Sequence, residues 1–558
     1  MPTVKELLRA GRKDELWKMC CGFLDYNIDQ FMAVQKSLLL EQIELLNNSF
    51  IGRKIFGETM PQDMDEFRKR VPLTTYADYC PELSEKMEDR LPGKTLYWQH
   101  SSGRSNEYPF NWEAIKWVPL TEEYARETGK LCGAMALISS CERKGDTSGI
   151  KPKQKFVYAV APLPYTSGTY AYLACDELGY VSMPPLEEAQ KLEFEERLAL
   201  SFKEALSKGF DFYFGLTIAL VAIGEKFNQQ MGKAKIMPLL KQPRALLRIM
   251  GGLLKSKLAG RRLLPKDLFS VKGILTSGGD GTIFRDVIKE TWGRYPLDVF
   301  VSTEAGFVAT QTWDYRSMTF IPSLNFLEFL SEDEYTRCEE DKNYVPKTVL
   351  LNEVKPGTKY EMVISSFHGC PLIRYRTGDV ITITSLRNDT LNINIPQMEF
   401  YGRVDDSLDI GGFIRLTERV VWQAVLNTGI PHVDWAARKE HKDQATVLHL
   451  YIEPKDEPNM SERQIAETIY TRLRDMDNGL PYCNVENVLN SMPVEVTFLP
   501  KGAFDYYISL RRAQGADLAH LKPRHMNVSD SDLSILLKEE AVAAQTASKS
   551  SEKLTISQ

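Results

Sequence analysis

The stretch Val271 to Gly306, VKGILTSGGDGTIFRDVIKETWGRYPLDVFVSTEAG, decides the fold class. Val271 to Thr276 predicts a buried strand, Thr282 to Trp292 predicts a helix, and Asp298 to Val301 predicts a second strand. Strand, helix and strand in succession predict a parallel crossover connection and therefore an α/β sheet. Because ligands of such sheets bind beyond the carboxyl ends of the strands, we expect a ligand site where these two strands end.

Length and charge limit the classes of protein that need to be considered. With 558 residues the chain exceeds a usual single domain, so two or more domains are expected. Lys and Arg number 69 and Asp and Glu 75, which gives a net charge of −6. This weak acidity argues against non-specific binding to nucleic acid.

The cysteines and apolar runs predict a cytoplasmic protein without stable membrane insertion. The nine cysteines form no CxxC pair and no Cys/His cluster with zinc spacing, which is typical of reduced cysteines in the cytosol. The N-terminus lacks the apolar core of a signal peptide. The most apolar run, Phe212 to Gly224, is shorter than the roughly 20 residues that span a bilayer, and we interpret it as a buried helix.

A second informative region lies between Pro371 and Leu416. Arg374-Tyr375-Arg376-Thr377-Gly378-Asp379 precedes an alternating, β-branched strand, Val380 to Thr384. An aspartate at such a strand edge can accept two hydrogen bonds from a vicinal diol, as a ribose offers. Gly402-Arg403-Val404-Asp405-Asp406 and the Gly411-Gly412 pair follow, and paired glycines permit a sharp change of backbone direction.

Two small polar turns stand earlier in the chain. Leu96 to Gln99 predicts a strand that runs into Ser101-Ser102-Gly103-Arg104-Ser105, a turn whose backbone N–H groups can surround phosphate oxygens. Pro164 to Thr169 follows a strand predicted at Phe156 to Val160. This second turn, with Tyr165 and Thr166, is either a wall of the acyl-substrate pocket or a structural turn only.

These motifs, in this order, resemble those of the adenylate-forming acyl-activating enzymes over roughly Phe67 to Arg524. Phenylacetate–coenzyme A ligases and the plant acyl-acid-amido synthetases, which conjugate auxin and jasmonate, are the nearest branches. The resemblance implies an α/β fold, with a large N-terminal adenylate-forming domain of mixed and parallel sheets and a small mobile α+β C-terminal domain. The large domain would span residues 1–404, with a helical cap over about 1–60, the small one 405–540, and a disordered tail 541–558.

The resemblance also implies roles for individual residues. Asp379 would bind the ribose, Glu304 would be catalytic and hold Mg²⁺, Asp405 would be the hinge, and Lys522 would be the mobile catalytic lysine, with Lys501 as a second candidate. The remaining residues implied to bind ATP or AMP lie in the turn at Ser101, in the stretch Val271 to Gly306, or in the region from Pro371 to Leu416: Ser101, Ser102, Gly103, Ser105, Gly278, Gly279, Ser302, Thr303, Arg376 and Arg403.

The sequence departs from the family pattern at the phosphate loop. Arg104 stands where threonine is usual, and the lysine that usually follows the Gly-rich stretch is missing. Arg104 would then act as a catalytic cation in its place, or the site is weakened. Together with Asp409, where a lysine is common, this leaves a catalytically impaired nucleotide-binding relative as an alternative.

The C-terminal part reads as a small α+β domain. Val433 to Ile452 and Val494 to Phe498 predict strands, and Ser461 to Asp475 predicts a helix. The resemblance implies ATP and Mg²⁺, a small carboxylic acid that becomes an acyl-adenylate, and transfer to an amine or to the thiol of coenzyme A. Neither the acid, nor the acceptor, nor the oligomeric state can be read from the sequence.

One segment fits none of these roles. Lys226 to Lys266 contains eleven lysines and arginines interleaved with leucines and contains no acidic residue. It predicts a solvated helix face, or a surface that attracts a polyanionic ligand or an acidic carrier protein to be loaded, or a membrane-surface helix.

Overall fold

A computed structural model describes residues 2–57, 59–100, 116–192, 194–217, 220–221, 223–224, 227, 242–277, 281–334, 337, 344–403, 407–410, 414–442, 445–475, 493–513 and 525–538. The chain divides into two compact units, residues 1–377 with 381–400, and residues 378–380 with 401–558. Each unit is described by itself. The hinge at Asp405 stays a prediction, since Asp405 lies outside the described residues.

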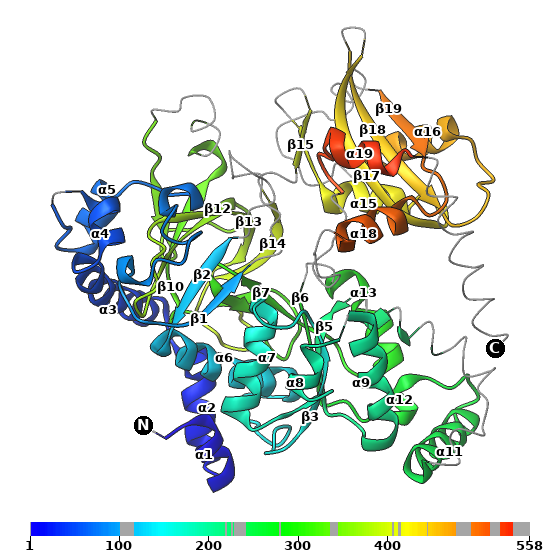
Figure 1. Ribbon diagram of the computed structural model, residues 1–558, viewed down its shortest axis with the longest axis horizontal. Helices are drawn as coiled ribbons and strands as arrows, with labels where there is room; N and C mark the ends of the chain where they lie inside the picture. Colours follow the sequence, from blue (N-terminus) through cyan, green and yellow to red (C-terminus); the bar gives the residue numbers. More distant parts are fainter. Residues whose placement is uncertain are drawn as a thin grey trace. The chain divides into compact units, whose positions relative to one another are not determined.

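A twelve-stranded sheet runs through the first unit in the order β11-β10-β12-β13-β14-β9-β8-β7-β6-β5-β3-β4 (Figure 1). At one end β4, β3, β5, β6 and β7 are parallel, whereas β7, β8 and β9 are antiparallel. The strand pairing in the sheet therefore changes from parallel to antiparallel at β7. Its strands are β3 Lys155–Ala159, β4 Val181–Met183, β5 Phe212–Leu216, β6 Gly273–Ser277, β7 Leu297–Ser302, β8 Gly306–Thr310, β9 Met318–Phe320, β10 Asn325–Ser331, β11 Thr348–Leu350, β12 Lys359–Ser366, β13 Tyr375–Ser385 and β14 Gln397–Arg403.

The predicted crossover is confirmed. β6 and β7 pair in parallel, and α13 Gly281–Trp292 connects them. The mixed α/β fold class is therefore confirmed as well. The helix interpretation of Phe212 to Gly224 is wrong at its start, because Phe212–Leu216 is the parallel strand β5. A short apolar run rich in aromatic residues suits a strand that is buried on both faces, and length alone distinguishes it from a buried helix.

Helices surround the sheet. The helices expected over residues 3–47 are present and begin at capping boxes on Thr3 and Asn27. Buried amides fix α3 to the sheet: Gln35 Nε2 donates to the Pro322 carbonyl at 3.0 Å, and Gln42 Nε2 donates to the Cys370 carbonyl at 2.8 Å. The helices of this unit are α1 Val4–Ala10, α2 Lys13–Cys21, α3 Ile28–Asn47, α4 Phe50–Phe56, α5 Met64–Arg70, α6 Glu122–Ser140, α7 Thr166–Leu178, α8 Leu186–Ala189, α9 Phe194–Lys208, α11 Pro243–Leu258 and α12 Pro265–Leu268, with 3₁₀ turns η1 Gly22–Asp25, η2 Tyr76–Tyr79 and η3 Glu88–Arg90.

A separate two-stranded ribbon precedes and follows the segment in which the phosphate turn is predicted. β1 Thr95–His100 pairs antiparallel with β2 Trp117–Thr121, and His100 lies opposite Trp117. The expected strand before Ser101 is thereby confirmed. The turn itself falls within 101–115, outside the described residues.

The second unit has its own sheet and its own core. β17 His432–Lys442 and β18 Ala445–Pro454 are antiparallel, and β19 Val494–Phe498 lies parallel to β18. The stretch expected to be strand from Val433 to Ile452 is thus a hairpin rather than one strand. A buried cluster that includes Trp435, Leu450 and Ile465 joins this sheet to its helices. The remaining elements are β15 Ser407–Ile410, β16 Ile414–Thr417, α15 Glu418–Leu426, α16 Glu462–Asp475, α18 Ala503–Ala513 and α19 Asp530–Leu536.

Candidate active site

The Ser302-Thr303-Glu304 turn lies at the carboxyl end of β7, where the parallel part of the sheet meets the antiparallel part. Such a change in strand order is where α/β sheets place ligands. Ser302 Oγ accepts a hydrogen bond from the Ala305 N–H at 3.1 Å, which closes the turn. The position that the sequence predicted for a ligand site is therefore occupied by this turn.

Two other elements meet the turn at Thr303. The Thr303 carbonyl accepts from Gln99 Nε2, near the end of β1, at 3.1 Å. Thr166 Oγ1, in the first residue of α7, lies 2.8 Å from Thr303 Oγ1. The structure thus brings together the end of β1, the start of α7 and the end of β7.

The turn at Pro164 to Thr169 forms the start of helix α7. Tyr165 is the N-cap of α7, and Thr166 is its first residue. The His100 ring lies between Tyr165 and Trp117, with ring centroids 4.2 and 4.7 Å away. Thr166 is buried, so its contact with Thr303 makes it part of the wall behind the turn.

Lys116 is a residue that the sequence analysis missed. It is 4% exposed, and its Nζ lies 3.6 Å from Glu304 Oε1 and 3.2 Å from the Tyr375 hydroxyl, to which it donates a hydrogen bond. The rings of Tyr76 and Tyr375 lie 5.7 and 5.9 Å from the same nitrogen, within the range of a cation–π contact. A buried ammonium group therefore faces Glu304.

The strand register explains how a lysine so far from the glycine turn reaches this place. Because His100 lies opposite Trp117, the antiparallel pairing places residue 116 at the end of β1. The available signal was a lysine placed directly before a buried strand, Trp117-Val118-Pro119-Leu120. Recognising it required the pairing of that strand with β1, which no local pattern shows.

The Glu304 carboxylate faces Lys116 without forming a hydrogen bond to it. Its side chain is 16% exposed, and its distance to Lys116 exceeds that of a hydrogen bond. Within the residues that the structure describes, no group donates a hydrogen bond to this carboxylate. Its oxygens are the hard donors that Mg²⁺ prefers, and Mg²⁺ is commonly held by one or two carboxylates together with substrate phosphates. Elsewhere among the described residues, no cluster of three or more potential metal ligands occurs.

The two arginines of the Arg374-Tyr375-Arg376 motif have different roles. Arg374 is buried and donates to both oxygens of Glu328, at 3.0 and 2.9 Å, so it belongs to the core. Arg376 lies on β13 with a quarter of its side chain exposed and pairs with Glu361 at 2.6 Å. Asp379 is buried on the same strand, after Gly378, whose φ of 73° is a conformation that favours glycine.

Two of the remaining predicted residues lie away from this turn in the chain, and the others lie outside the described residues. Arg403 ends β14, and Lys501 lies exposed in the turn before α18. The following lie outside the described residues: Ser101, Ser102, Gly103, Arg104, Ser105, Gly278, Gly279, Asp405 and Lys522.

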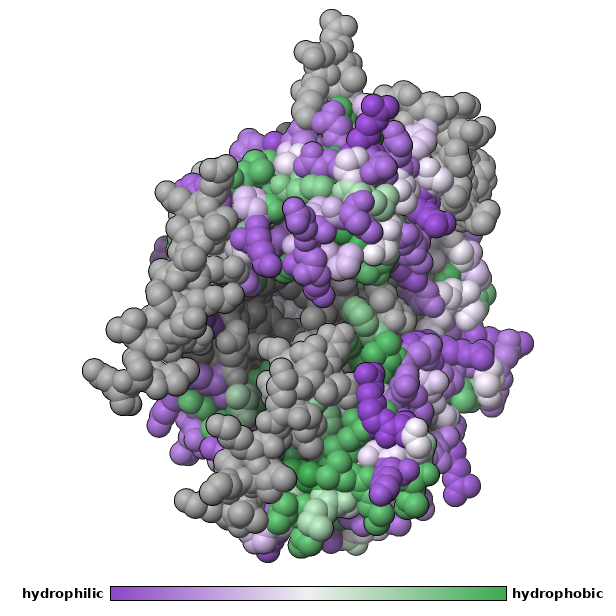
Figure 2. Space-filling view, turned by 90° about the vertical axis from the view of Figure 1, so that its right-hand side faces the viewer, coloured by the Kyte–Doolittle hydropathy of each residue, from purple (hydrophilic) through white to green (hydrophobic). Residues whose placement is uncertain are grey.

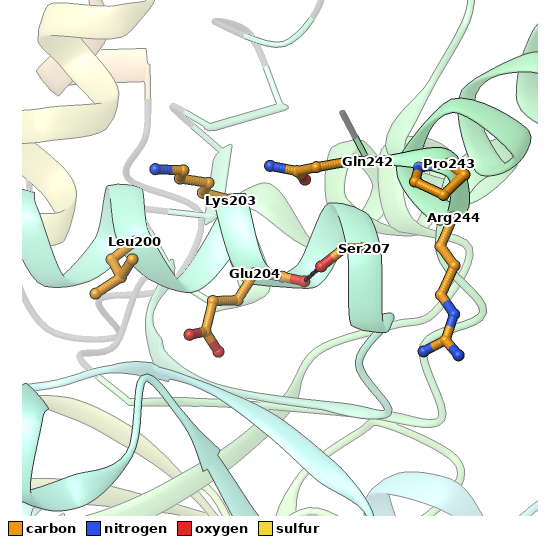
Figure 3. Close-up of a pocket in the computed structure, with 7 residues that line it drawn as sticks. All are labelled: Leu200, Lys203, Glu204, Ser207, Gln242, Pro243 and Arg244. Atoms are coloured by element: carbon orange, nitrogen blue, oxygen red, sulfur yellow. Dashed lines mark hydrogen bonds between the residues drawn. The ribbon is translucent and has the colours of Figure 1, made fainter. Parts of the chain in front are cut away.

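A surface hollow elsewhere contains none of the predicted residues. Its volume is about 430 Å³, and its lining comes from α9 and from the start of α11 (Figure 3). Within it Ser207 Oγ donates to the Glu204 carbonyl at 3.0 Å, and Glu204 pairs with Lys208 at 2.8 Å. The lining residues are Leu200, Lys203, Glu204, Ser207, Gln242, Pro243 and Arg244.

Comparison with known proteins supports the interpretation of the fold. Residues 22–187 match the GH3 family N-terminal domain, and residues 318–403 match the GH3 family central domain. The sequence is 28% identical over 235 residues to indole-3-acetic acid-amido synthetase GH3.15 of Arabidopsis thaliana, covering 39% of this chain and 38% of that protein. It is 35% identical over 94 residues to indole-3-acetic acid-amido synthetase GH3.8 of Oryza sativa subsp. indica, covering 17% of this chain and 14% of that protein. The chain thus aligns with well under half the length of these curated relatives.

Solved structures extend the similarity of fold to nearly the whole chain. The AtGH3.15 acyl acid amido synthetase in complex with 2,4-DB superposes with a TM-score of 0.66 at 18% identity, covering 93% of this chain and 95% of that one. An open conformation of 2-hydroxyisobutyryl-CoA ligase gives a TM-score of 0.50 at 14% identity, covering 84% and 87%. Two segments of the chain therefore match the N-terminal and central domains of the GH3 family, and the fold is that of the AtGH3.15 acyl acid amido synthetase.

Proposed function

We propose that the protein is an AMP-forming ligase that activates a small carboxylic acid with ATP and transfers the acyl group to an amine. The observation that carries the proposal is the buried Lys116 ammonium group facing Glu304 at the carboxyl end of β7. One cation and one carboxylate, held at the place where the sheet changes character, suit a site that receives a triphosphate and its metal.

The first half-reaction joins the acid to the nucleotide. A carboxylate oxygen attacks the α-phosphorus of ATP, the bond to the bridging oxygen of pyrophosphate breaks, and an acyl-adenylate forms. Lys116 would offset negative charge on the phosphates, which preorganised cations stabilise most as the charge develops. Lys116 thereby offers the positive charge that the phosphate loop lacked by sequence. This argues against a relative that has lost catalysis.

Glu304 would hold Mg²⁺, which supplies charge neutralisation at the phosphates when it is bound. Asp379 would hold the ribose diol, and Arg376 would lie near the nucleotide with its guanidinium positioned by Glu361. Thr166 would keep Thr303 in place from behind. These roles divide the site into residues that touch the nucleotide and residues that position them.

The second half-reaction releases AMP. An amine nitrogen attacks the acyl carbon, the bond to the phosphate oxygen breaks, and the nitrogen loses a proton, which leaves an amide. We favour an amine because the matched relatives carry names of amido synthetases. Coenzyme A is the second candidate acceptor, since the superfamily fold also serves a coenzyme A ligase.

A screen of pyrophosphate release over a panel of carboxylic acids tests the proposal, with mixed amino acids in one series and coenzyme A in the other. We expect acid-dependent pyrophosphate release, and an amide product only in the amino-acid series. Glu304→Gln, which keeps the size and removes the charge, should lower the rate by about two to three orders of magnitude. No release with any acid would overturn the proposed activity, and a thioester product would move the acceptor to coenzyme A.

A further inference from the structure

Helix α11, Pro243–Leu258, carries a second apolar stripe that the fold does not use. Five large hydrophobic side chains are exposed on it, and besides Leu253 at 50% these are the four of the stripe: Leu247 at 69%, Met250 at 58%, Leu254 at 61% and Leu258 at 81%. Their spacing of three, four and four residues places them on one line along a helix with about 3.6 residues per turn. A solvated helix face, as the sequence allowed, would carry polar residues there instead.

The opposite side of α11 is already packed. Its buried residues are Ala245, Ile249, Gly252 and Ser256, which lie about half a turn away from the exposed stripe. A Cβ added at Gly252 would lie 2.3 Å from Leu268 Cδ2 of α12, so this side is in close contact with its neighbour. The helix is therefore anchored through one side, and the exposed stripe does not need to turn inward to complete the core.

Cations flank the exposed stripe. Arg244 and Lys255 lie on one side of it and Lys257 on the other, and all three are exposed. No acidic residue occurs from Gln242 to Lys266. Glu204, which lines the neighbouring hollow with Arg244, is paired with Lys208. The surface of α11 is thus apolar along its ridge and positively charged along its flanks.

The patch is visible on the face of the molecule where α11 lies. In Figure 1 this helix is at the lower right, and Figure 2, which views that side, shows hydrophobic surface gathered in its lower part. The stripe is a ridge of side chains at least half exposed, whereas a site for a small ligand is concave. A convex apolar ridge of this kind can insert into a soft, deformable surface.

We propose that α11 is a peripheral membrane-binding helix that lies in the headgroup region of a bilayer containing anionic lipids. The four apolar side chains would enter the acyl boundary, and Arg244, Lys255 and Lys257 would meet lipid phosphates and carboxylates. Among the described residues, no helix is long and apolar enough to cross a membrane. A second copy of this chain is a poorer occupant, because pairing α11 with itself brings like charges together without an acid in the segment.

Vesicle flotation of the full-length protein tests the proposal. Vesicles of phosphatidylcholine alone are compared with vesicles of phosphatidylcholine and phosphatidylserine, at low and at high salt. We expect flotation with the anionic vesicles and a decrease at high salt, where charges are screened. Absence of flotation with anionic vesicles, or equal flotation with both kinds, would overturn the proposal.

Two variants separate the apolar contribution from the charged one. Leu247→Gln/Met250→Gln/Leu254→Gln/Leu258→Gln keeps good helix formers and should lower partitioning by at least about 100-fold. Lys255→Gln/Lys257→Gln should lower it by roughly 25-fold, because each of the two basic residues near an anionic surface contributes about fivefold. The matched control, Val345→Gln/Leu386→Gln, removes exposed apolar side chains elsewhere and should float as the unmodified protein does.

Oligomeric state and folding complete the experiment. Circular dichroism of each variant verifies the fold, and the lysine variant provides the test if the fourfold variant does not fold. Light scattering after gel filtration reports association in the absence of lipid. If the unmodified protein is a dimer that the fourfold variant dissociates, or if this variant floats unchanged, the stripe does not bind membranes and the proposal fails.

Discussion

Two cation–carboxylate pairs in the first unit differ in how many of their hydrogen bonds are made within the protein. Arg374 donates to both oxygens of Glu328 and also to the carbonyls of Arg68 and Val71, and the arginine and the glutamate are 4% and 1% exposed. Lys116 and Glu304 remain 3.6 Å apart, and the Glu304 side chain is 16% exposed. In the first pair, both carboxylate oxygens of Glu328 accept hydrogen bonds from Arg374. In the second pair, the Glu304 oxygens accept no hydrogen bond from Lys116 and can bind a ligand.

We infer from this difference that the first pair stabilises the fold and that the second pair binds a ligand. A buried charge is tolerated when its partner and its hydrogen bonds are complete, and removing one partner leaves the other uncompensated. A carboxylate that is not hydrogen-bonded to its cation can still bind a metal ion or a ligand with its oxygens. We therefore expect substitution of the first pair to affect stability and substitution of the second to affect the reaction.

The largest effect is expected at the pair Arg374–Glu328. Arg374→Met removes the bidentate partner of Glu328 and leaves Arg68, whose Nε lies 3.6 Å from Glu328 Oε1, as a weaker one, so the free energy of unfolding should fall by about 3 kcal/mol. Urea unfolding followed by tryptophan fluorescence measures this as a shift of the first transition. The double variant Arg374→Met/Glu328→Gln removes both charges and should recover part of the loss. A change below about 1 kcal/mol in the single variant would contradict the comparison.

Substitution in the pair Lys116–Glu304, called the open pair below, should affect the reaction rather than the stability. Lys116→Met keeps an unbranched chain in the same pocket and should lower carboxylate-dependent pyrophosphate exchange by about 100- to 1000-fold, because a preorganised cation is lost. The matched control is Lys130→Met, which removes a lysine paired with Glu127 at 2.7 Å on the surface of α6. If Lys116→Met stays within about threefold of the unmodified protein, which is less than 1 kcal/mol of barrier, Lys116 does not face the phosphates.

A third enclosed cation extends the comparison to the second unit, and this one can lose its charge. His525 lies between Glu418 and Asp434, with Nε2 2.7 Å from Asp434 Oδ1, and stacks on Trp435 at 4.6 Å. Although burial lowers the pKa of His525, the two carboxylates outweigh it and raise this pKa to about 10. Because the folded pKa exceeds the unfolded value, the stabilisation is complete below about pH 6.5 and is lost as the pH rises toward 10.

The second unit should therefore become less stable between pH 7 and pH 8, by up to about 1.4 kcal/mol. Thermal unfolding followed by fluorescence at a series of pH values measures this slope. His525→Gln removes the titrating group and should flatten the slope in this window while lowering stability at neutral pH. An unchanged slope in His525→Gln would assign the pH dependence to another group.

The sequence alone was sufficient for features that depend on local pattern. The β6-α13-β7 crossover follows from an apolar run, a helical period and a second apolar run, and the polar residues after β7 necessarily fall at the carboxyl edge. The resemblance of the motifs added the expectation of an adenylate-forming fold, which agrees with the fold shared with the AtGH3.15 acyl acid amido synthetase. Strand pairs between distant segments were beyond reach, which is why Phe212–Leu216 was interpreted as helix.

The roles of the charged side chains show a second limit. Arg374 and Arg376 stand two residues apart, and in sequence both could contact a ligand. Arg374 instead meets Glu328, which is 46 residues away, and Arg376 meets Glu361, which is 15 residues away. Lys116 was missed for the converse reason, since its partner Glu304 is supplied by a distant strand. Whether a charged group faces a ligand or another side chain is decided by such distant partners.

The smallest effect is expected behind the open pair, at the hydrogen bond between Thr166 and Thr303. Thr166→Val keeps the shape of the side chain and removes the hydroxyl 2.8 Å from Thr303 Oγ1, which should cost about 1 kcal/mol. If Thr166 positions the Ser-Thr-Glu turn, this cost should appear as a roughly fivefold lower kcat in pyrophosphate exchange. If Thr166 instead forms the wall of the acyl pocket, the KM for the carboxylic acid should change and kcat should not. Thr166→Ser restores the hydroxyl and should recover kcat, so the positioning role is contradicted when Thr166→Val and Thr166→Ser have the same kcat.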